Sequence, residues 1–486
     1  MSALTTIGAI SKIQYPYQFQ QLIEALLGEE SQHITSVIDA PPNTTFRFNP
    51  LKHTIPLQQN LLRNQGVRFQ MLEHLPLAAR LQRQTPSIGR SFSHFVGHLY
   101  IQDLSSMLPV LVLAPQPGEW VLDMCAAPGS KTTQLASMMK NRGLILANDV
   151  SVKRIRSLLF NLRRMGVKNA AVCRGFGEQY GNLYFETFHR VLLDPPCSAL
   201  GTLHKSPEVL SWWTPARSEK LAGIQFRLVE SGLKALKPGG VMTYSTCTIT
   251  PEENEKVIDL ALDRFPVELE EIHLPGLVTR TALTQYKTQK FKPELSRAIR
   301  IYPWDNQSEA FFIARLRKTG SFGKKKVAAD DNDRGLLHLD EESAKTHLLR
   351  LADYYGIDLA TFDDDHYSMQ RDLYCSSLDL GEISLPKFLV KAGLPMAHVR
   401  SNEAKLTTEG THLFGQFASQ RTVSLPDLAA LEQYVNRDPL PSPLGDLYQV
   451  LVHYGDAPIG HAISHNGRLL SRFPRAGWRF QIQPDG

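Results

Sequence analysis

Short apolar runs alternate with amphipathic segments between residues 100 and 318, and this alternation is the strongest pattern in the chain. The apolar runs, which predict strands, cover residues 120–124, 143–149, 169–173, 189–194 and 239–247. The amphipathic segments, which predict helices, cover residues 132–140, 151–166, 215–236 and 251–265. The last two open with proline, which suits the first turn of a helix. This order predicts an α/β fold with a doubly wound, mostly parallel sheet that helices cover on both faces.

Two changes in composition predict the domain boundaries. Residues 319–335 are polar, with a basic triplet followed by acids and no apolar period, so they predict an exposed linker. A weaker change falls at residues 95–100, where a segment rich in proline and glutamine ends. We therefore expect an N-terminal domain, a central domain and a C-terminal region over residues 1–99, 100–318 and 336–486.

The composition limits the classes to which the protein can belong. Its 486 residues amount to about three domains of roughly 150 residues each. Hydrophobic residues make up 42% and charged residues 21%, which is typical of globular proteins. Mean hydropathy is -0.22. No apolar run approaches the roughly 20 residues of a membrane helix, and no signal-peptide pattern is evident. We therefore expect a cytoplasmic protein that makes no membrane contact.

The cysteine count and the net charge narrow the choice further. The five cysteines are an odd number, widely spaced and without a CxxC pair, which argues against a disulfide scaffold and a structural zinc site. We expect no metal, and we interpret His453, His461 and His465 as ordinary surface or core residues. A net charge of +5 permits a polyanionic partner if the basic side chains gather on one surface.

The first strand–helix loop and the acid after the next strand form a candidate cofactor site. Ligands of open parallel sheets bind beyond the carboxyl ends of the strands. The loop DMCAAPGSK (Asp123–Lys131) has small residues that let a ligand approach the backbone, although it is neither a Walker loop nor GxGxxG. Asp149, twenty positions past Gly129, is placed to accept ribose hydroxyls. A tight turn and a helix N-cap are the alternatives. Together the two features favour an adenosine-containing cofactor that lacks a pyrophosphate.

Two cysteines stand at the ends of neighbouring predicted strands. Asp194-Pro-Pro-Cys197 closes one strand, and its two prolines hold a carboxylate and a thiol on a rigid lip. Thr246-Cys247 closes the following strand, so we expect both thiols to face one cleft. A buried cysteine usually serves only as a small apolar residue. We keep that interpretation for the other three, Cys125, Cys173 and Cys375.

These motifs resemble a known enzyme family. MCAAPGSKTTQLA, LLDPPCSALGTLHKSPE and YSTCTITPEENE resemble the signature motifs of the Sun/Nop-type RNA (cytosine-5) methyltransferases. FRFNPLK, YIQDLSSMLP and EAFFIARLRK extend the resemblance over about residues 45–318. The C-terminal region more loosely resembles the PUA-like domain of the bacterial small-subunit rRNA methyltransferase F group. The resemblance implies a class I S-adenosylmethionine methyltransferase domain, a small N-terminal α/β RNA-binding domain and a C-terminal PUA-like small β-barrel region that binds RNA.

The resemblance also implies a reaction and its residues. S-adenosylmethionine would donate a methyl group to carbon 5 of a cytidine in RNA, while Cys247 forms a covalent bond with the base. Cys197 would assist proton removal or release, although DNA cytosine methyltransferases attack from this Pro-Cys position. Asp194 would hold the cytosine edge, and Lys131 would organise that pocket and lower a thiol pKa. The residues expected to hold the cofactor are Cys125, Ala126, Ala127, Pro128, Gly129, Ser130, Lys131, Asp149, Phe176 and Asp194.

Two positions depart from the family pattern. Phe176 stands where the family usually has an acid that reads the adenine, so Phe176 would line the adenine or Glu178 would substitute for the acid. Ala199 stands where a glycine is often found, and we expect it to be tolerated if the backbone there is not left-handed.

The expected partner is RNA, either small-subunit ribosomal RNA or an assembled 30S particle. Expected RNA contacts are Arg47, Lys52 and Lys205, with the basic helix over 151–166 as a weaker candidate. In the C-terminal region the candidates are Lys387, Lys391, Arg400, Arg468, Arg472 and Arg475. A tRNA cytosine-5 methyltransferase and a catalytically idle RNA-binding assembly factor are alternatives. An amino-group methyltransferase is a third, but such enzymes place an aromatic residue after the acid-Pro-Pro lip.

Overall fold

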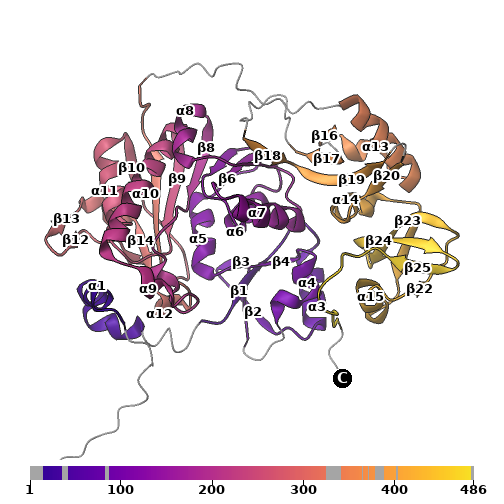
Figure 1. Cartoon of the computed structure of the whole chain (residues 1–486), viewed down its shortest axis with the longest axis horizontal. Helices are drawn as coiled ribbons and strands as arrows, with labels where there is room; N and C mark the ends of the chain where they lie inside the picture. The colour runs from indigo at the N-terminus through magenta and orange to yellow at the C-terminus, as the bar shows by residue number, and fades with distance from the viewer. Residues whose placement is uncertain are drawn as a thin grey trace, which may run out of the picture.

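The computed structural model describes eight segments of the chain, namely residues 15–34, 42–82, 87–323, 341–363, 365–369, 372–377, 388–400 and 403–482. Residues 324–335 of the expected linker and Lys387 lie outside these segments. Figure 1 shows a central α/β domain flanked by the small N-terminal sheet and by the C-terminal region. Among the described residues, no helix is long and apolar enough to cross a membrane.

A ten-stranded sheet forms the centre of the molecule. Its parallel core has the order β9-β8-β5-β6-β7, with β5 (Trp120–Asp123), β6 (Leu144–Asn148), β7 (Ala170–Cys173), β8 (Phe188–Leu193) and β9 (Leu236–Thr246). These are the five strands that the apolar runs predict. Antiparallel strands extend both edges: β10 (Val267–Glu270), β11 (Arg280–Thr281), β14 (Ile299–Ile301), β15 (Phe311–Lys318) and β18 (Leu389–Ala392). The sheet is therefore mixed, with a parallel centre, rather than mostly parallel.

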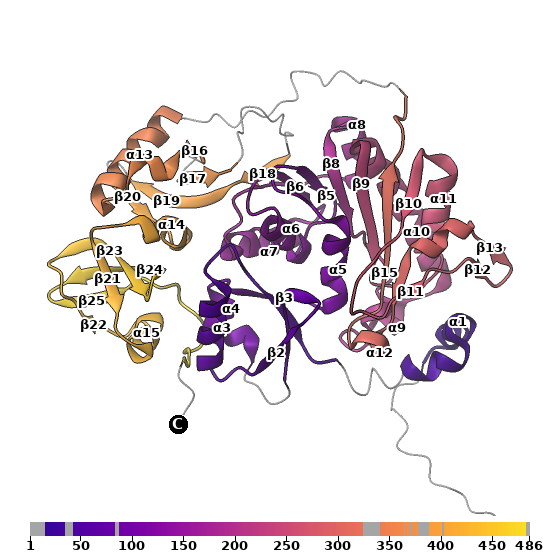
Figure 2. The same cartoon turned by 180° about the vertical axis from the view of Figure 1, so that it is seen from behind.

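Helices cover both faces of this sheet, as Figure 2 also shows. One face packs against α5 (Leu104–Leu113), α6 (Ser130–Met138) and α7 (Val152–Met165). The other face packs against α8 (Tyr180–Leu183), α10 (Pro215–Ala235) and α11 (Glu255–Arg264). Thr214 caps α10 by accepting from the Arg217 N–H, and Gly166 ends α7 in the left-handed conformation that glycine adopts without strain. Helix α11 begins at Glu255, four residues later than the proline at 251 predicts.

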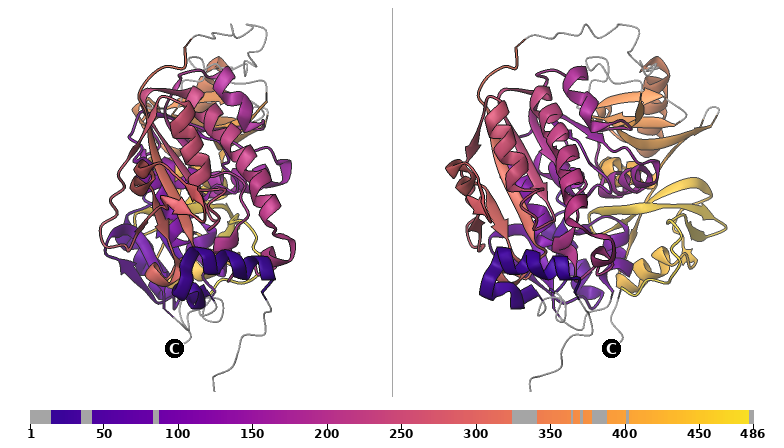
Figure 3. Two further views of the ribbon diagram at one scale, coloured as in Figure 1. Left: turned by 90° about the vertical axis from the view of Figure 1, so that its left-hand side faces the viewer. Right: turned by 60° about the vertical axis from the view of Figure 1, so that its left-hand side comes forward.

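The N-terminal part does not coincide with the expected domain over residues 1–99. Its antiparallel sheet has the order β2-β3-β1-β4, with β1 (Thr45–Phe48), β2 (Phe69–Leu72), β3 (Leu75–Leu81) and β4 (Leu99–Ile101). Because β4 pairs with β1, the sheet extends past the expected boundary to Ile101. Helix α1 (Tyr17–Leu27) instead packs on the central domain (Figure 3). Its Phe19 ring meets the Trp213 ring edge to face.

The C-terminal region forms two sheets with separate cores, where the sequence suggests one small barrel. The first sheet contains β16 (His366–Met369), β17 (Leu373–Ser376), β19 (Leu394–Arg400) and β20 (Glu403–Leu406). The second contains β21 (Thr422–Leu425), β22 (Leu440–Pro441), β23 (Leu447–Tyr454), β24 (Ala457–His465) and β25 (Arg468–Ser471). The helices of this region are α13 (Glu341–Tyr355), α14 (Thr408–Phe414) and α15 (Leu428–Val435).

The second C-terminal sheet shares its hydrophobic core with two N-terminal helices, α3 (Ile55–Asn64) and α4 (Phe92–Phe95). Leu61 and Phe92 from these helices lie in one buried cluster with Tyr434, Phe473 and Phe480. Figures 1 and 2 show the yellow end of the chain lying against α3 and α4. Because these large aromatic side chains are buried between the N-terminal helices and the second C-terminal sheet, they hold the two parts in a defined arrangement.

Candidate active site

The Cys197 and Cys247 thiols lie side by side at the carboxyl edge of the central sheet. Each follows the end of a strand, β8 for Cys197 and β9 for Cys247, and these strands are parallel neighbours. The two sulfur atoms are 3.3 Å apart, and both cysteines are free thiols. The contact with Cys197, together with burial, raises the pKa of Cys247 well above its ordinary value. The two sulfurs that we expect to face one cleft are therefore in direct contact.

A buried glutamate ties together the two loops that carry the thiols. The Glu253 side chain is fully buried, and its carboxylate accepts hydrogen bonds from the Ser198 N–H at 2.9 Å, Gln225 Nε2 at 2.9 Å and Thr250 Oγ1 at 3.0 Å. One residue past each thiol, the hydroxyls of Ser198 and Thr248 are 2.6 Å apart. These bonds fix the loops to each other, so they hold the spacing of the two sulfurs.

The same loop explains why α11 begins late. Thr246 Oγ1 donates to Asn254 Oδ1 at 2.5 Å, and Asn254 Nδ2 donates to the Thr248 carbonyl at 3.0 Å. Residues 251–254 therefore turn inward to bind the strand end instead of continuing the helix. Sequence reasoning missed Glu253 and Asn254, although two polar residues directly before an amphipathic helix are the signal that could have identified them.

Replacing Glu253 with alanine is expected to lower the free energy of unfolding by about 3 kcal/mol or more, because three buried donors lose their acceptor. Urea denaturation measures this loss. Glu253→Gln keeps an acceptor oxygen and should lose less. Glu252→Ala, at the partly exposed neighbour, is the matched control and should stay within about 0.5 kcal/mol of the parent. A loss at Glu253 no larger than at Glu252 would contradict the role of this carboxylate.

Lys131 and Asp194 form an ion pair beside the thiols. Lys131 Nζ is 2.6 Å from Asp194 Oδ2 and donates to Ser106 Oγ at 3.1 Å, and Ser245 Oγ donates to Asp194 Oδ1 at 3.3 Å. Burial works to lower the pKa of Lys131, but Asp194 outweighs it, so the pKa lies above the ordinary lysine value. The charge of Lys131 is thus matched by a carboxylate, and the expected lowering of a thiol pKa is not found at Cys247.

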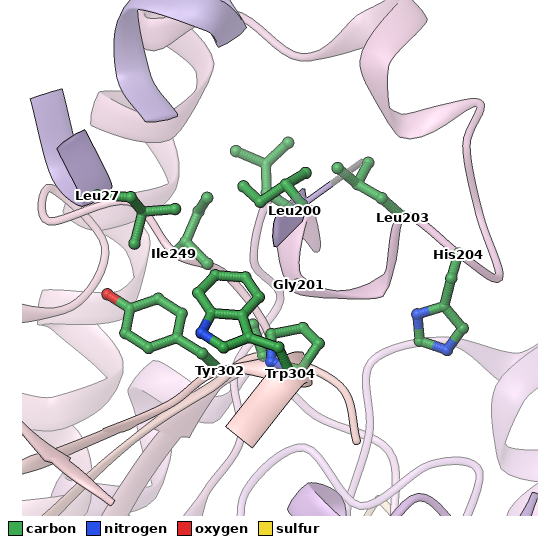
Figure 4. A pocket seen from close by; sticks show the side chains of 11 residues that line it. Leu27, Leu200, Gly201, Leu203, His204, Ile249, Tyr302 and Trp304 are labelled. Atoms are coloured by element: carbon green, nitrogen blue, oxygen red, sulfur yellow. The ribbon is translucent and has the colours of Figure 1, made fainter. Parts of the chain in front are cut away.

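The loop after Cys197 is tightly packed against the strand end that carries Cys247. Ala199 has a φ of 58°, so its backbone is left-handed. In this conformation alanine costs about 1 kcal/mol of folding free energy relative to glycine. At Gly201 a Cβ would lie 2.4 Å from the Ala310 carbonyl oxygen, so only glycine fits. Figure 4 shows a small apolar pocket here, between Leu200 and Gly201 on one side and Tyr302 and Trp304 on the other.

The loop between β5 and α6 lies against Asp149. The Asp149 side chain is 2% exposed, and its carboxylate accepts from the Ala127 N–H at 3.3 Å and the Ser151 N–H at 2.9 Å. Arg154 pairs with Asp149 at 3.1 Å and also donates to the Ala127 carbonyl. Gly129 has a φ of 106°, and a Cβ there would meet Leu158 at 3.0 Å. The loop is thus held to the end of β6 by one carboxylate and one arginine.

Asn148, which sequence reasoning did not single out, ends β6 and joins the loops that follow its two neighbours, β5 and β7. Its Nδ2 donates to the Met124 and Gly175 carbonyls at 3.1 Å each, and its Oδ1 accepts from the Gly175 N–H at 2.9 Å. A polar residue at the end of an otherwise apolar strand is the signal that could have found it. Phe176 directly follows Gly175, to which Asn148 is bound. Phe176 is 62% exposed, so its ring is available to cover a flat ligand.

Arg47 is not available to RNA, which corrects the expectation. Its side chain is 3% exposed, and Nε donates to Gln102 Oε1 at 2.8 Å. Nη2 donates to the Ser130 carbonyl at 2.9 Å and to Thr133 Oγ1 at 2.5 Å. Arg47 therefore binds the first turn of α6, and its charge lies in the protein interior.

Of the other two expected RNA contacts, Lys52 lies between two parts of the chain and Lys205 lies on the surface. Lys52 Nζ lies 2.8 Å from His412 Nδ1, so Lys52 joins the N-terminal part to the C-terminal region. Lys205 pairs with Glu309 at 2.5 Å and lies 3.9 Å from Asp103, yet its side chain is 54% exposed. Of the three expected RNA contacts, Lys205 therefore stays a candidate on the surface, although its charge is paired with Glu309. In the described residues there is no group of three or more His, Cys, Asp or Glu side chains that could hold a metal ion.

Comparisons with known proteins agree with the α/β methyltransferase fold. A family model described as 16S rRNA methyltransferase RsmB/F matches residues 110–317. Ribosomal RNA small subunit methyltransferase F of Klebsiella pneumoniae (strain 342) is 33% identical over 397 residues, which cover 80% of each chain. The tRNA (cytosine(49)-C(5))-methyltransferase of Pyrococcus abyssi is 36% identical over 315 residues, 63% of this chain and 99% of its own.

A solved structure extends the comparison to three dimensions. The crystal structure of a methyltransferase homolog protein from Pyrococcus horikoshii has a TM-score of 0.57 and 38% sequence identity, and covers 63% of this chain and 95% of that one. The fold and these matches define the class: the chain is an RNA (cytosine-5) methyltransferase with a class I α/β methyltransferase domain. It belongs to the Sun/Nop family, which includes the 16S rRNA methyltransferases RsmB/F.

Proposed function

We propose that this enzyme transfers a methyl group from S-adenosylmethionine to carbon 5 of a cytidine in small-subunit ribosomal RNA, through a covalent bond between Cys247 and the base. The observation that carries the proposal is the 3.3 Å contact between the sulfurs of Cys247 and Cys197. One thiol can add to the base while the other lies within reach of the bond that must later break.

The chemistry follows from the weak nucleophilicity of carbon 5 in cytosine. The Cys247 sulfur forms a bond to carbon 6 as its thiol proton passes to the site shared by Asp194 and ring nitrogen 3, and the displaced electron pair makes carbon 5 nucleophilic enough to take the methyl group. Asp194, with Lys131 bound to it, faces ring nitrogen 3, where a shared proton stabilises the addition product. A base then removes the proton on carbon 5, and the sulfur–carbon bond breaks to release 5-methylcytosine. We assign proton removal or this release to Cys197.

The residues present fit S-adenosylmethionine, which supplies an electrophilic methyl group when bound. A ribose needs acceptors, and a carboxylate has about four acceptor positions. Asp149 uses three of them, for the Ala127 N–H, the Ser151 N–H and Arg154. One position therefore remains for a ribose hydroxyl. Ala126, Ala127 and Gly129 keep the loop narrow, and the exposed ring of Phe176 can cover an adenine, while the set contains no pyrophosphate-binding glycine pair.

Asp149→Ala is expected to weaken cofactor binding by about 10- to 100-fold, because a buried charged acceptor is lost and the Ala127 N–H loses its partner. Titration calorimetry with S-adenosylhomocysteine measures the affinity. Asp149→Asn keeps one acceptor oxygen, so its affinity for the cofactor product should lie between those of Asp149→Ala and the parent protein. Asp263→Ala, on the exposed side of α11, is the control and should bind like the parent. Equal affinities for Asp149→Ala and Asp263→Ala would remove Asp149 from the cofactor site.

Small-subunit ribosomal RNA is the substrate that the relatives favour. The relative named for small-subunit ribosomal RNA aligns with 80% of this chain, while the one named for tRNA aligns with 63%. We therefore infer that the N-terminal sheet and the C-terminal sheets serve to bind ribosomal RNA around the target. Methyl transfer from labelled cofactor to 30S particles, naked 16S rRNA and tRNA decides between the substrates. Labelling of tRNA alone would replace our assignment, and no labelling of any RNA would favour an idle assembly factor.

A further inference from the structure

A second pair of a lysine and a carboxylate borders the thiol site, on the side of β15. Glu309 stands two residues before β15, which runs antiparallel to its neighbour β9 (Figure 2). The start of β15 therefore lies at the same edge of the sheet as the end of β9, which Cys247 follows. Lys205 Nζ binds Glu309 Oε1 at 2.5 Å. In the strand order this pair lies beyond β9, whereas Asp194 follows β8 on the other side.

Backbone hydrogen bonds fix Glu309 relative to Cys247. The Ala310 N–H donates to the Gly201 carbonyl at 3.1 Å, and the Gly201 N–H donates to the Cys247 carbonyl at 2.9 Å. The Glu309 N–H donates to Asp103 Oδ1 at 3.0 Å, at the start of α5. Glu309 is therefore held in one position beside the strand end that carries the nucleophile.

The charges of this pair act on the Cys247 sulfur. The contact with Cys197 and burial are the main causes of the raised pKa of Cys247, and the charge of Glu309 adds to them. Burial works to lower the pKa of Lys205, but the charge of Glu309 outweighs it and raises the pKa above the ordinary lysine value. The charge of Cys247 contributes to this rise. Glu309 and Lys205 therefore lie within electrostatic reach of the reacting sulfur.

Glu309 has the properties of a proton acceptor. Burial, followed by the charge of Asp103, raises the pKa of its carboxyl group, which makes it a stronger base than an exposed glutamate. Its Oε1 binds Lys205, while its Oε2 accepts no hydrogen bond from the part of the chain that the structure describes. Asp103 Oδ1, in contrast, already accepts from the N–H and the hydroxyl of Ser105 and from the Glu309 N–H. Asp103 therefore positions Glu309, which keeps one carboxylate oxygen for a substrate proton.

We propose that Glu309 removes the proton from carbon 5 of the methylated cytosine. The proposal rests on the proposed function, because it concerns the second half of that reaction. In the strand order β15-β9-β8-β5-β6, the thiols lie between Glu309 and the loops that we assign to the cofactor. A methyl group that arrives from the cofactor side leaves the hydrogen of carbon 5 on the opposite face of the ring. That hydrogen then faces β15 and Glu309.

The step balances in atoms and electrons. A Glu309 carboxylate oxygen takes the hydrogen of carbon 5 as a proton, and the electron pair of that bond becomes the double bond between carbons 5 and 6. The bond from carbon 6 to sulfur breaks, and its electron pair goes to the Cys247 sulfur, which regains the proton held at ring nitrogen 3. Cys197, whose sulfur is 3.3 Å away, donates a hydrogen bond to the departing sulfur. Glu309 thus removes the proton, and Cys197 assists release.

The test is Glu309→Gln in the full chain, assayed on 16S rRNA that carries tritium at carbon 5 of its cytidines, both as naked RNA and in 30S particles. Tritium that appears in water reports proton removal. We expect its release to fall about 100-fold or more, the range that a positioned base contributes. Because sulfur attack and methyl transfer precede this step, the variant should still transfer one labelled methyl group per protein molecule. That methyl group should stay in a covalent protein–RNA complex on a denaturing gel.

Two further variants and one trap make the result specific. Glu309→Asp keeps a carboxylate and should recover part of the tritium release. The control is Glu268→Gln, which changes an exposed carboxylate on β10, the strand paired with β15, and should release tritium at the parent rate. RNA that contains 5-fluorocytidine cannot lose the group at carbon 5, so Glu309→Gln should trap it as the parent protein does. Tritium release by Glu309→Gln at the parent rate would overturn the proposal. Failure of this variant to trap the fluorinated RNA would also overturn it, because Glu309 would then act before methyl transfer.

The parent protein separates this proposal from the proposed function. A parent that releases no tritium and traps no fluorinated RNA would refute the proposed reaction, and the role of Glu309 with it. A parent that reacts, beside a Glu309→Gln variant that reacts equally fast, would refute the role of Glu309 alone.

Discussion

Cys247→Ala is expected to abolish methyl transfer, with a loss of about 10⁴-fold or more, because carbon 5 of cytosine then has no nucleophile to activate it. The variant should also form no covalent complex with RNA that contains 5-fluorocytidine. Transfer is measured with labelled S-adenosylmethionine, and the complex is measured on a denaturing gel. The fold should be kept, since Cys247 is only partly buried and Cys197 is the one hydrogen-bonding partner of its sulfur among the described residues.

The matched control is Cys375→Ala. Cys375 is a buried free thiol in the first C-terminal core, remote from the active site in sequence and in sheet, so its loss should leave trapping intact. Retention of the covalent complex in Cys247→Ala, together with its disappearance in Cys197→Ala, would reverse the roles of the two thiols. Pro-Cys would then be the nucleophilic motif, as in DNA cytosine methyltransferases.

Cys197→Ala is expected to stop the reaction after the bond to RNA has formed. The Cys247 thiol remains, so addition and methyl transfer proceed, but the group that assists proton removal or release is lost. Turnover should fall by about 10²- to 10³-fold, the range that a positioned acid or base contributes. A covalent protein–RNA complex should accumulate on unmodified RNA, where the parent protein shows none, and a denaturing gel detects it.

The double variant Cys197→Ala/Cys247→Ala is the control for that complex and should accumulate none, because the bond to RNA comes from Cys247. Cys197→Ala turning over at the parent rate without a trapped complex would reduce Cys197 to a packing residue. The two sulfurs are in contact, so each variant removes one thiol from the same site. Either removal leaves the Glu253 hydrogen bonds between the two loops in place, so the variants differ in chemistry and not in loop position.

The sequence by itself predicted the five parallel strands of the central domain and the helices α6, α7, α10 and α11 that cover them. The strands, the helices and the loops of Cys197, Cys247, Asp149 and Gly129 follow from local patterns, because apolar periodicity decides which residues a strand or helix can bury. The contact of the two thiols could also be anticipated, since parallel strands bring their carboxyl ends to one edge. The C-terminal sheets and the late start of α11 could not, because the bonds that decide them join distant or inward-turned side chains.

Only the tertiary structure decided which polar side chains are free to act. Arg47 is basic in the sequence, yet its partners Gln102, Ser130 and Thr133 lie 55 to 86 positions away and bury it. Glu253 serves the thiols through Ser198, which lies 55 positions before it. The hollow beside α7 is likewise lined by Arg472, which lies more than 300 positions after that helix. Burial and pairing of charges depend on such long-range neighbours, and no local pattern of residues contains them.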